Sequence, residues 1–374
     1  MEESVSQGHQ VAAIVHDHTG GELSDFEVCS NVDIYRAKSL GQFLYAPIAP
    51  SIPSLIRRVI LSYQPDILHL HMPNLTVFFL LLMSVAKKIP WVVHWHSDVE
   101  FNKDQFVPRL AYTLFYSKLE SKVLKAAKRI IVTSPPYLET SKALLPFVEK
   151  CSVIPLGLAP DEKKENGGEK QKVPDAHDAD KVGVIKLLTV GRLSYYKGHK
   201  TLLAALSQIS QVANHFQLDI VGTGECESLL LAQIKDLRLD KCVRLRGYIS
   251  DEKIDQYFHN CDIFCLPSIN RSEAFGLVLL EAFRAGKPCL VSNVTGSGMN
   301  WVVGDGVEGW HFKQENVESL IEMLSYLASH PKTISELGDN ARKRYNMVFK
   351  IDQIYRLIDQ EYLLVLNSTQ EIEA

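Results

Sequence analysis

The 374-residue sequence lacks an excess of charge of either sign: 40 lysines and arginines face 44 aspartates and glutamates, for a formal net charge of -4. A chain with this balance offers no basic surface for nucleic acid, so we expect no nucleic-acid partner.

The sequence also lacks a long hydrophobic run. The most apolar stretch, residues 77–83, is far shorter than the roughly 20 residues that cross a bilayer, and we expect it to form a buried helix.

Paired cysteines are missing as well. The seven cysteines show no spacing typical of a disulfide framework or a zinc site, which favours a reducing compartment. The N-terminus has no basic segment followed by an apolar one, so we expect no secretory signal and a cytoplasmic protein. Six histidines fall at the ends of predicted strands without cysteine or carboxylate ligands at recognisable spacing, and we expect no metal site. They are His16, His18, His69, His71, His94 and His96.

Two successive series of short apolar runs alternate with longer amphipathic ones, the pattern of parallel strands joined by helices. The chain is long enough for two domains with a core each. Residues 161–181 are charged and rich in Gly and Pro, which predicts a solvated linker. We therefore predict α/β domains over residues 1–158 and 182–345, a polar linker over 159–181, and a C-terminal helix over 346–374 that packs back on the first domain.

The predicted strands locate the candidate site, because ligands of doubly wound sheets bind beyond the carboxyl ends of the strands. In the first half the strands are residues 10–16, 66–71, 91–96, 129–133 and 151–155. In the second half they are residues 185–190, 217–221, 242–246, 263–266 and 289–291.

Two cations follow the first strand of the second half. Gly191 and Arg192 end this strand, and Lys197 precedes an apolar helix that starts near Thr201. An arginine can hold two oxygens of a diphosphate, and a lysine adds a mobile point charge. Taken alone, the pair is equally well read as a solvated basic turn.

A helix is predicted to begin near Phe275, within SEAFGLVLLEAFRAGKP. Free backbone N–H groups at such an N-terminus bind phosphate, and Gly276 permits close approach of an anion. The carboxylate of Glu273 could then accept hydrogen bonds from a sugar, and that of Glu281 from a ribose. The alternative is a capped helix with Ser272 as N-cap, Glu273 in a favourable position in the first turn, and Glu281 on the solvent-exposed face.

In their order along the chain, these motifs resemble the retaining glycosyltransferases of family 4. Further motifs of the resemblance, which extends over nearly the whole chain, are HSD at 96–98, TSPPY at 133–137, VIPLGL at 153–158 and VGTGE at 221–225. The resemblance implies the GT-B fold, with two facing Rossmann-like domains, a deep interdomain cleft and a C-terminal crossover helix. It also implies metal-independent transfer of a hexose, without a cofactor, from a nucleotide sugar to a saccharide or lipid-linked acceptor in polysaccharide biosynthesis. The leading donors are GDP-mannose and a UDP-linked glucose.

The resemblance also assigns roles by position. Arg192 and Lys197 would hold the donor diphosphate, Glu281 the ribose, and Glu273 and His96 the sugar, with the leaving phosphate itself taking the acceptor's proton. The catalytic set is then Glu273, Arg192, Lys197 and His96. The remaining donor-binding residues that it implies are Gly191, Gly222, Gly224, Tyr248, Ala274, Phe275, Gly276 and Leu277.

Two features leave alternatives open. Family members open with a strand, a Gly-rich loop and a helix before a Gly-His pair, which here stands at Gly8 and His9. We expect that the strand and loop are missing, and a catalytically inactive nucleotide-sugar-binding or partner subunit remains an alternative. The aromatic and basic residues of 108–129 suit either peripheral contact with the inner face of the membrane or an ordinary amphipathic helix.

Overall fold

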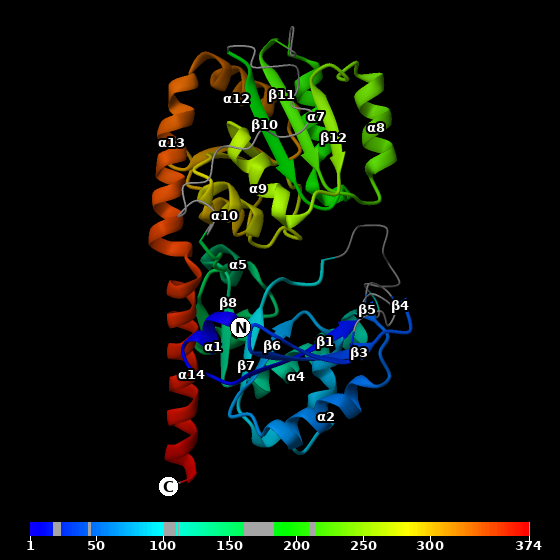
Figure 1. Ribbon diagram of the computed structural model, residues 1–374, viewed down its shortest axis with the longest axis vertical. Helices are drawn as coiled ribbons and strands as arrows, with labels where there is room; N and C mark the ends of the chain where they lie inside the picture. The colour runs from blue at the N-terminus through cyan, green and yellow to red at the C-terminus, as the bar shows by residue number, and fades with distance from the viewer. Residues whose placement is uncertain are drawn as a thin grey trace. The chain divides into compact units, whose positions relative to one another are not determined.

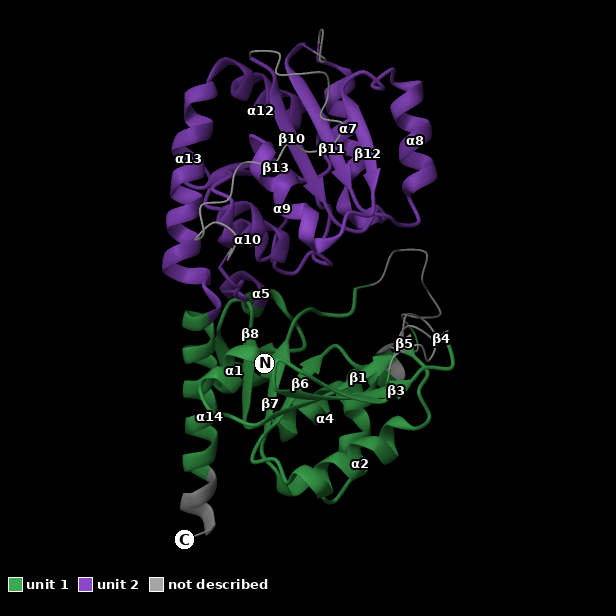
Figure 2. Cartoon of the chain, viewed as in Figure 1, with its two compact units in different colours: residues 1–133, 138–155, 352–374 green, residues 134–137, 156–351 purple. Residues whose placement is uncertain are grey.

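The computed structural model (Figure 1) divides into two compact units (Figure 2). Unit 1 comprises residues 1–133, 138–155 and 352–374, and unit 2 comprises residues 134–137 and 156–351. The predicted linker falls outside the described residues, apart from its first two positions. The residues described are 1–17, 24–43, 46–100, 110, 112–160, 183–209 and 214–373.

Unit 2 is built on six parallel strands in the order β12-β11-β10-β13-β14-β15. The chain steps outward from β10 (Ile185–Val190) through β11 (Phe216–Val221) to β12 (Val243–Gly247), then returns to the other side of β10 as β13 (Ile263–Leu266). This reversal makes a topological switch point between β10 and β13, where doubly wound sheets bind ligands. The outer strands are β14 (Cys289–Asn293) and β15 (Gly309–Lys313).

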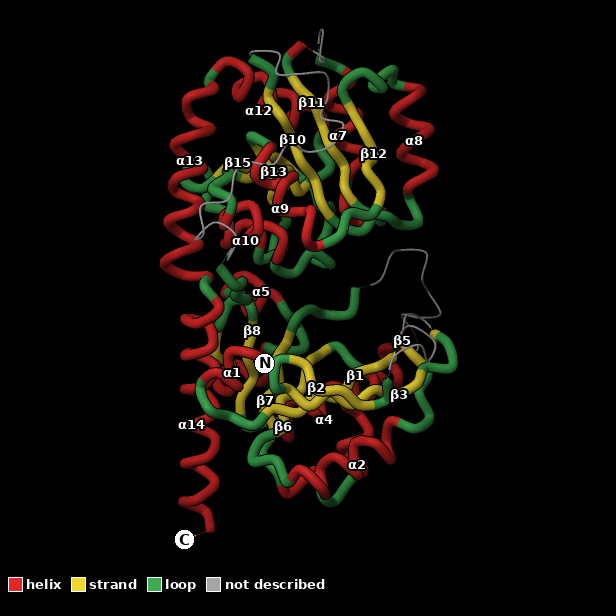
Figure 3. The backbone as a smooth tube through the Cα atoms, in the orientation of Figure 1, coloured by secondary structure: helices red, strands yellow, loops and turns green. Residues whose placement is uncertain are grey.

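Side chains along these strands alternate between two hydrophobic cores, one on each face of the sheet. Leu187 of β10 packs in the first core and Leu188 in the second, because successive residues of a strand point to opposite faces. Helices cover both faces (Figure 3). The first core is closed by α7 (His199–Ser207), α8 (Glu227–Asp236) and α12 (Val317–Ser329). The second core is closed by α9 (Asp251–Asn260), α10 (Leu277–Arg284), α11 (Met299–Val302) and η7 (Tyr345–Phe349). Helix α13 (Pro331–Arg344) contributes to both cores.

In unit 1 the described strands form separate sheets. A parallel sheet has the order β6-β7-β8-β9, and a second sheet has the order β1-β3-β2. The strands predicted in this half are all present, whereas β2 to β5 were not predicted. Their bounds are β1 Val11–Asp17, β2 Phe26–Cys29, β3 Val32–Lys38, β4 Gln42–Phe43, β5 Ala46–Pro47, β6 Leu68–Met72, β7 Trp91–Trp95, β8 Arg129–Val132 and β9 Cys151–Val153.

The prediction of a buried helix over residues 77–83 is confirmed only in part. This segment is the 3₁₀ helix η1 (Leu75–Leu82), in which Val77 and Leu80 are buried while Leu82 is 83% exposed. In a 3₁₀ helix residues three apart lie above one another, so only a narrow stripe faces the core. The other helices of this half are α1 (Glu2–Ser6), α2 (Ile52–Tyr63), η2 (Ala86–Lys88), η3 (Tyr112–Tyr116), α4 (Ser117–Ala126), α5 (Pro135–Thr140) and η4 (Leu145–Lys150).

The predicted final helix is present as α14 (Ile351–Glu373). Its Ile354 and Val365 pack against Val92 of the four-stranded sheet. The guanidinium of Arg129 on β8 donates to the carboxylate of Glu361 on α14 at 2.5 and 3.3 Å. Helix α14 is therefore fastened to the sheet of unit 1 by apolar contacts and an ion pair. Among the described residues, none of the helices combines the length and apolarity needed to span a bilayer.

Candidate donor-binding site

Glycines allow the loops after three adjacent strands of unit 2 to pack closely. Gly191 follows β10, Gly222 follows β11, and the Gly222 N–H donates to the carbonyl of Gly247 at 2.8 Å. Gly222 has a φ of +132°, and a Cβ there would lie 2.0 Å from the Gly191 carbonyl oxygen. A Cβ on Gly224 would lie 2.5 Å from the carbonyl oxygen of Leu193. The predicted glycines Gly191, Gly222 and Gly224 thus lie together because no larger residue fits between these loops.

The loop that carries Lys197 is fixed across the switch point. Lys197 ends the short helix η5 between β10 and α7. The next residue, Gly198, has a φ of +69°, and a Cβ on it would lie 1.9 Å from the carbonyl oxygen of Pro267. The N–H of Ile269 donates to the carbonyl of Tyr196 at 2.7 Å. The loops after β10 and β13 are therefore in direct contact.

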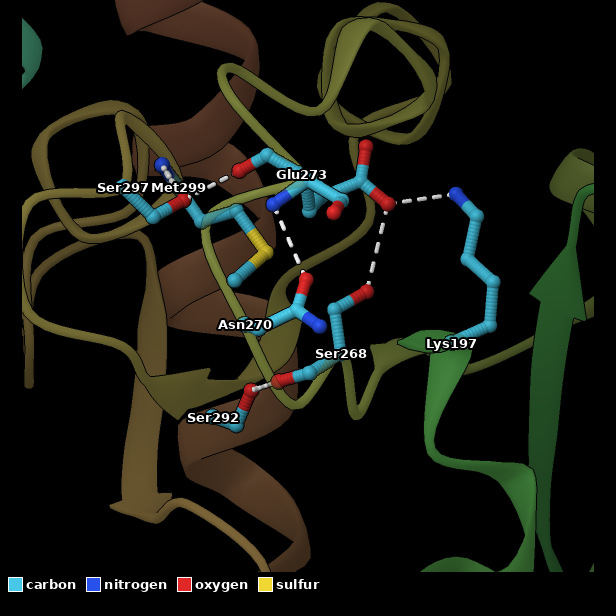
Figure 4. Close-up of polar contacts among 8 residues, drawn as sticks. Lys197, Ser268, Asn270, Glu273, Ser292, Ser297 and Met299 are labelled. Carbon is cyan, nitrogen blue, oxygen red and sulfur yellow. Dashed lines mark hydrogen bonds and ion pairs between the residues drawn. The ribbon is translucent and has the colours of Figure 1, made fainter. Parts of the chain in front are cut away.

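This contact brings together two of the predicted catalytic residues (Figure 4). The Lys197 ammonium donates to a carboxylate oxygen of Glu273 at 2.5 Å, and the hydroxyl of Ser268 donates to the same oxygen at 3.2 Å. Lys197 is 8% and Glu273 9% exposed, so each charge depends on the other for compensation. Lys197 also lies close over Gly191, where a Cβ would stand 3.3 Å from Nζ. The site thus holds a cation and a hydrogen-bond acceptor side by side.

Three buried serines, which sequence reasoning missed, hold the Glu273 loop (Figure 4). Ser292 of β14 donates its hydroxyl proton to the carbonyl of Ser268. Ser297 donates to the carbonyl of Glu273 at 2.5 Å and accepts from the N–H of Met299 at 3.2 Å. Glu273 is therefore held at its carboxylate by one serine and at its backbone by another. The only available signal was the position of these serines at or after β13 and β14.

The helix beside Glu273 begins later than predicted. Gly276, in the left-handed conformation with a φ of +81°, is the N-cap of α10, so Ser272 is not the cap. The side chain of Phe275 is 3% exposed and packs against Phe349 with ring centroids 6.2 Å apart. The carbonyl of Ala274 accepts from the Gly298 N–H at 2.7 Å. Phe275 therefore serves the core through its side chain, which leaves its backbone for any ligand contact.

Other predicted donor-binding residues lie on the surface of unit 2. Arg192 donates to Glu225 at 3.2 Å in a pair whose side chains are 64% and 54% exposed. Such an exposed pair contributes little stability, so Arg192 can exchange partners at small cost. Tyr248, just after β12, is 74% exposed, and Leu277 at the start of α10 is 43% exposed.

Glu281 lies one turn into α10 and is partly buried. Burial raises the pKa of its carboxyl to about 7, Asp255 and Asp251 raise it further, and Arg284 opposes them. Within the described residues, Glu281 makes no polar contact with the Lys197–Glu273 pair. The structure thus places Glu281 on the helix that follows Glu273, without a polar contact to the buried pair.

The histidines predicted at strand ends lie in unit 1, and His18 lies outside the described residues. His96 directly follows β7, with its Nε2 2.8 Å from Nδ1 of His71. Its ring stacks on that of His94 with centroids 4.4 Å apart. Burial, aided by the nearby His71, lowers the pKa of His96 to about 4. The imidazole of His96 is therefore neutral at physiological pH.

Comparisons with known proteins identify the family of the chain. Residues 1–162 match the family described as Glycosyltransferase Family 4, and residues 175–344 match Glycosyl transferases group 1. The chain is 29% identical over 303 residues to the O-antigen chain mannosyltransferase C of Escherichia coli, covering 81% of this chain and 76% of that protein. It is 30% identical over 289 residues to the D-rhamnosyltransferase WbpZ of Pseudomonas aeruginosa, covering 77% and 71%.

Solved structures resemble the whole chain. Sucrose-phosphate synthase from Thermosynechococcus elongatus superposes with a TM-score of 0.76 at 21% identity, covering 98% of this chain and 92% of that one. Anabaena Alr3699/HepE in complex with UDP superposes with a TM-score of 0.64 at 19% identity, covering 88% and 85%. At these identities the likeness establishes the fold, which is GT-B.

Proposed function

The chain belongs to glycosyltransferase family 4, and we propose that it transfers a hexose from GDP-mannose. As a member of this family, it is a retaining enzyme that takes a sugar from a nucleotide sugar in polysaccharide biosynthesis. The names of the mannosyl- and rhamnosyltransferase relatives support a mannose-type sugar. A UDP-linked glucose is the second candidate, supported by the UDP bound to the structural neighbour from Anabaena. The proposed acceptor is a saccharide or a lipid-linked saccharide.

The observation that carries the proposal is the buried contact between Lys197 and Glu273 at the switch point. Cleavage of the bond between sugar and diphosphate builds negative charge on the departing oxygens. Lys197 and Arg192, together with the free N–H groups at the start of α10, would stabilise that charge. Glu273, held by Ser268, would accept hydrogen bonds from the sugar hydroxyls. In this proposal the leaving phosphate takes the acceptor's proton, so no side chain acts as nucleophile.

His96 is proposed as a second contact to a saccharide hydroxyl. Its neutral imidazole both donates and accepts hydrogen bonds, which suits a hydroxyl group. The proposal for His96 rests on its place in the HSD motif and on the pKa near 4 that keeps it uncharged.

A panel of nucleotide sugars tests the proposed function. The purified chain is incubated with GDP-mannose, UDP-glucose and related donors, and release of the nucleoside diphosphate is measured. We expect GDP-mannose to be consumed at least about tenfold faster than the others. Lys235, exposed on α8, provides the control Lys235→Ala, which should keep this activity. Consumption of none of the donors, with no nucleoside diphosphate bound in calorimetry, would overturn the proposal.

We further propose that unit 1 contacts an anionic membrane surface peripherally. Leu82 of η1 and Phe115 of η3 are 83% and 69% exposed, and Phe78 packs against Tyr116 with centroids 4.9 Å apart. Exposed lysines follow on α4 and complement anionic headgroups: Lys118, Lys122 and Lys125.

Co-sedimentation with vesicles tests this contact. The wild-type chain should sediment with vesicles that contain an anionic phospholipid, and Leu82→Ser with Phe115→Ser should weaken the binding severalfold. The matched control is Leu231→Ser, since Leu231 is 51% exposed in unit 2. Equal sedimentation of both variants would contradict a membrane surface at η1 and η3.

A further inference from the structure

Three histidines on neighbouring strands of unit 1 form a compact group of ring nitrogens. His69 and His71 lie two residues apart on β6, and His71 is the register partner of His94 on β7. In a parallel pair these positions share one face of the sheet. One ring nitrogen from each of the three histidines lies within 4.8 Å of the other two.

From this geometry we propose that His69, His71 and His94 form a binding site for one divalent transition-metal ion of the zinc type. A tetrahedral ion with metal–nitrogen bonds of about 2.0–2.1 Å holds its nitrogen ligands roughly 3.3 Å apart. Nε2 of His69 and Nδ1 of His94 are 3.3 Å apart. Two ligands therefore already stand at the required separation, and rotation of the exposed His71 side chain would supply the third.

The surroundings of His94 and His69 constrain the orientation of their rings. His94 is 6% exposed, and its Nε2, on the opposite side of the ring from the Nδ1 that faces His69, is buried without a hydrogen-bond partner among the described residues. On the helix above the sheet, the hydroxyl of Tyr362 lies 2.5 Å from Nδ1 of His69. Such a contact fixes the ring orientation of a ligating histidine.

The chemistry of the ligands selects the ion. Burial, with smaller contributions from neighbouring charges, lowers the pKa of His69 to about 3 and lowers that of His94. His71 is exposed as a residue, but its ring stacks on three neighbouring imidazoles, and this desolvation lowers its pKa as well. All three imidazoles are therefore uncharged at neutral pH and have a free lone pair for a metal. A set made only of imidazoles suits Zn²⁺, Co²⁺, Ni²⁺ or Cu²⁺ and disfavours Mg²⁺ and Ca²⁺, which prefer oxygen. Solvent would complete the coordination beside the exposed His71.

Titration of the metal-stripped full chain with Co²⁺, followed by visible absorption, and with Zn²⁺, followed by calorimetry, tests this site. We expect one ion per chain and a raised melting temperature of unit 1. His71→Ala, a change at an exposed position, should weaken binding at least about tenfold, and Tyr362→Phe should weaken it by about tenfold through loss of ring orientation.

His330→Ala is the matched control, because His330 is an exposed histidine of unit 2, and it should bind as the wild type does. Circular dichroism establishes that each variant is folded. Absence of stoichiometric binding, or equal affinity in wild type and His71→Ala, would overturn the proposal. Neither readout depends on transferase activity, so failure of the metal site and failure of the proposed function are separate results.

Discussion

At the scale of single residues, Lys197 has the clearest consequence for turnover. Its ammonium is the buried cation of the site, 2.5 Å from Glu273. We expect Lys197→Ala to lower kcat by on the order of a hundredfold, because one fixed charge on the leaving diphosphate is removed. Arg192→Ala should act in the same direction. Steady-state kinetics with the preferred donor provides the check, and near-normal turnover in both variants would refute the phosphate assignment.

The raised pKa of Glu281 predicts that the stability of the chain depends on pH. Its pKa, raised from 4.5 to about 7, means that the folded chain keeps a proton that the unfolded chain releases between these values. Stability from this group is therefore greatest at low pH and is lost as the pH rises to about 7. Glu281→Gln, which cannot ionise, should melt at a higher temperature than wild type at about pH 8 and equally at about pH 5.

The same substitution should weaken nucleoside diphosphate binding at about pH 8 by roughly tenfold, if this carboxylate accepts hydrogen bonds from ribose. Thermal melts and calorimetry at both pH values separate the two effects. A melting difference that is the same at both pH values would show that burial does not raise the pKa of Glu281.

At the scale of elements, α14 should determine the stability of unit 1. Glu361 is 8% exposed and pairs with Arg129, so Glu361→Ala leaves a partly buried guanidinium without its partner. We expect a loss of about 2–3 kcal/mol in the free energy of unfolding. The control is Asp352→Ala, which breaks the exposed pair with Arg356 on the same helix and should cost less than about 0.5 kcal/mol. Hydrogen exchange resolved by unit measures the effect of each variant on unit 1. Equal protection of unit 1 in Glu361→Ala and Asp352→Ala would contradict this role of α14.

The elements also show what the sequence could predict. The buried strands on either side of the switch point were found because each is a short apolar run between helical patterns. Strand β3 was missed because its charged residues Asp33, Arg36 and Lys38 do not keep the two-residue alternation of a half-buried strand. The turn before it, Ser30 and Asn31, also lacks glycine, although both residues have positive φ. Lys197 and Glu273 were selected as candidates through spaced motifs. Ser297 was not, because a hydroxyl that donates to a backbone carbonyl follows no spacing rule.

At the scale of the whole molecule, acid should destabilise unit 1 selectively. Burial lowers the pKa of His69 to about 3 and that of His96 to about 4, while the unfolded chain takes up these protons near 6.5. The stability contribution is thus present above about pH 6.5 and is lost as the pH falls toward 4. Hydrogen exchange at about pH 5 and pH 7.5 should show a larger loss of protection in the β6–β7 strands than in β10 and β13. Equal losses would argue against neutral histidines in unit 1.

The central claim is retaining transfer from a nucleotide sugar at the Lys197–Glu273 site, and an NMR time course of the reaction tests it most directly. One experiment reports both the rate of donor loss and the anomeric configuration of the product. With an α-linked donor we expect an α-linked product from wild type, and Glu273→Gln should form the same product on the order of a hundredfold more slowly. A β-linked product, or an undiminished rate in Glu273→Gln, would contradict the account.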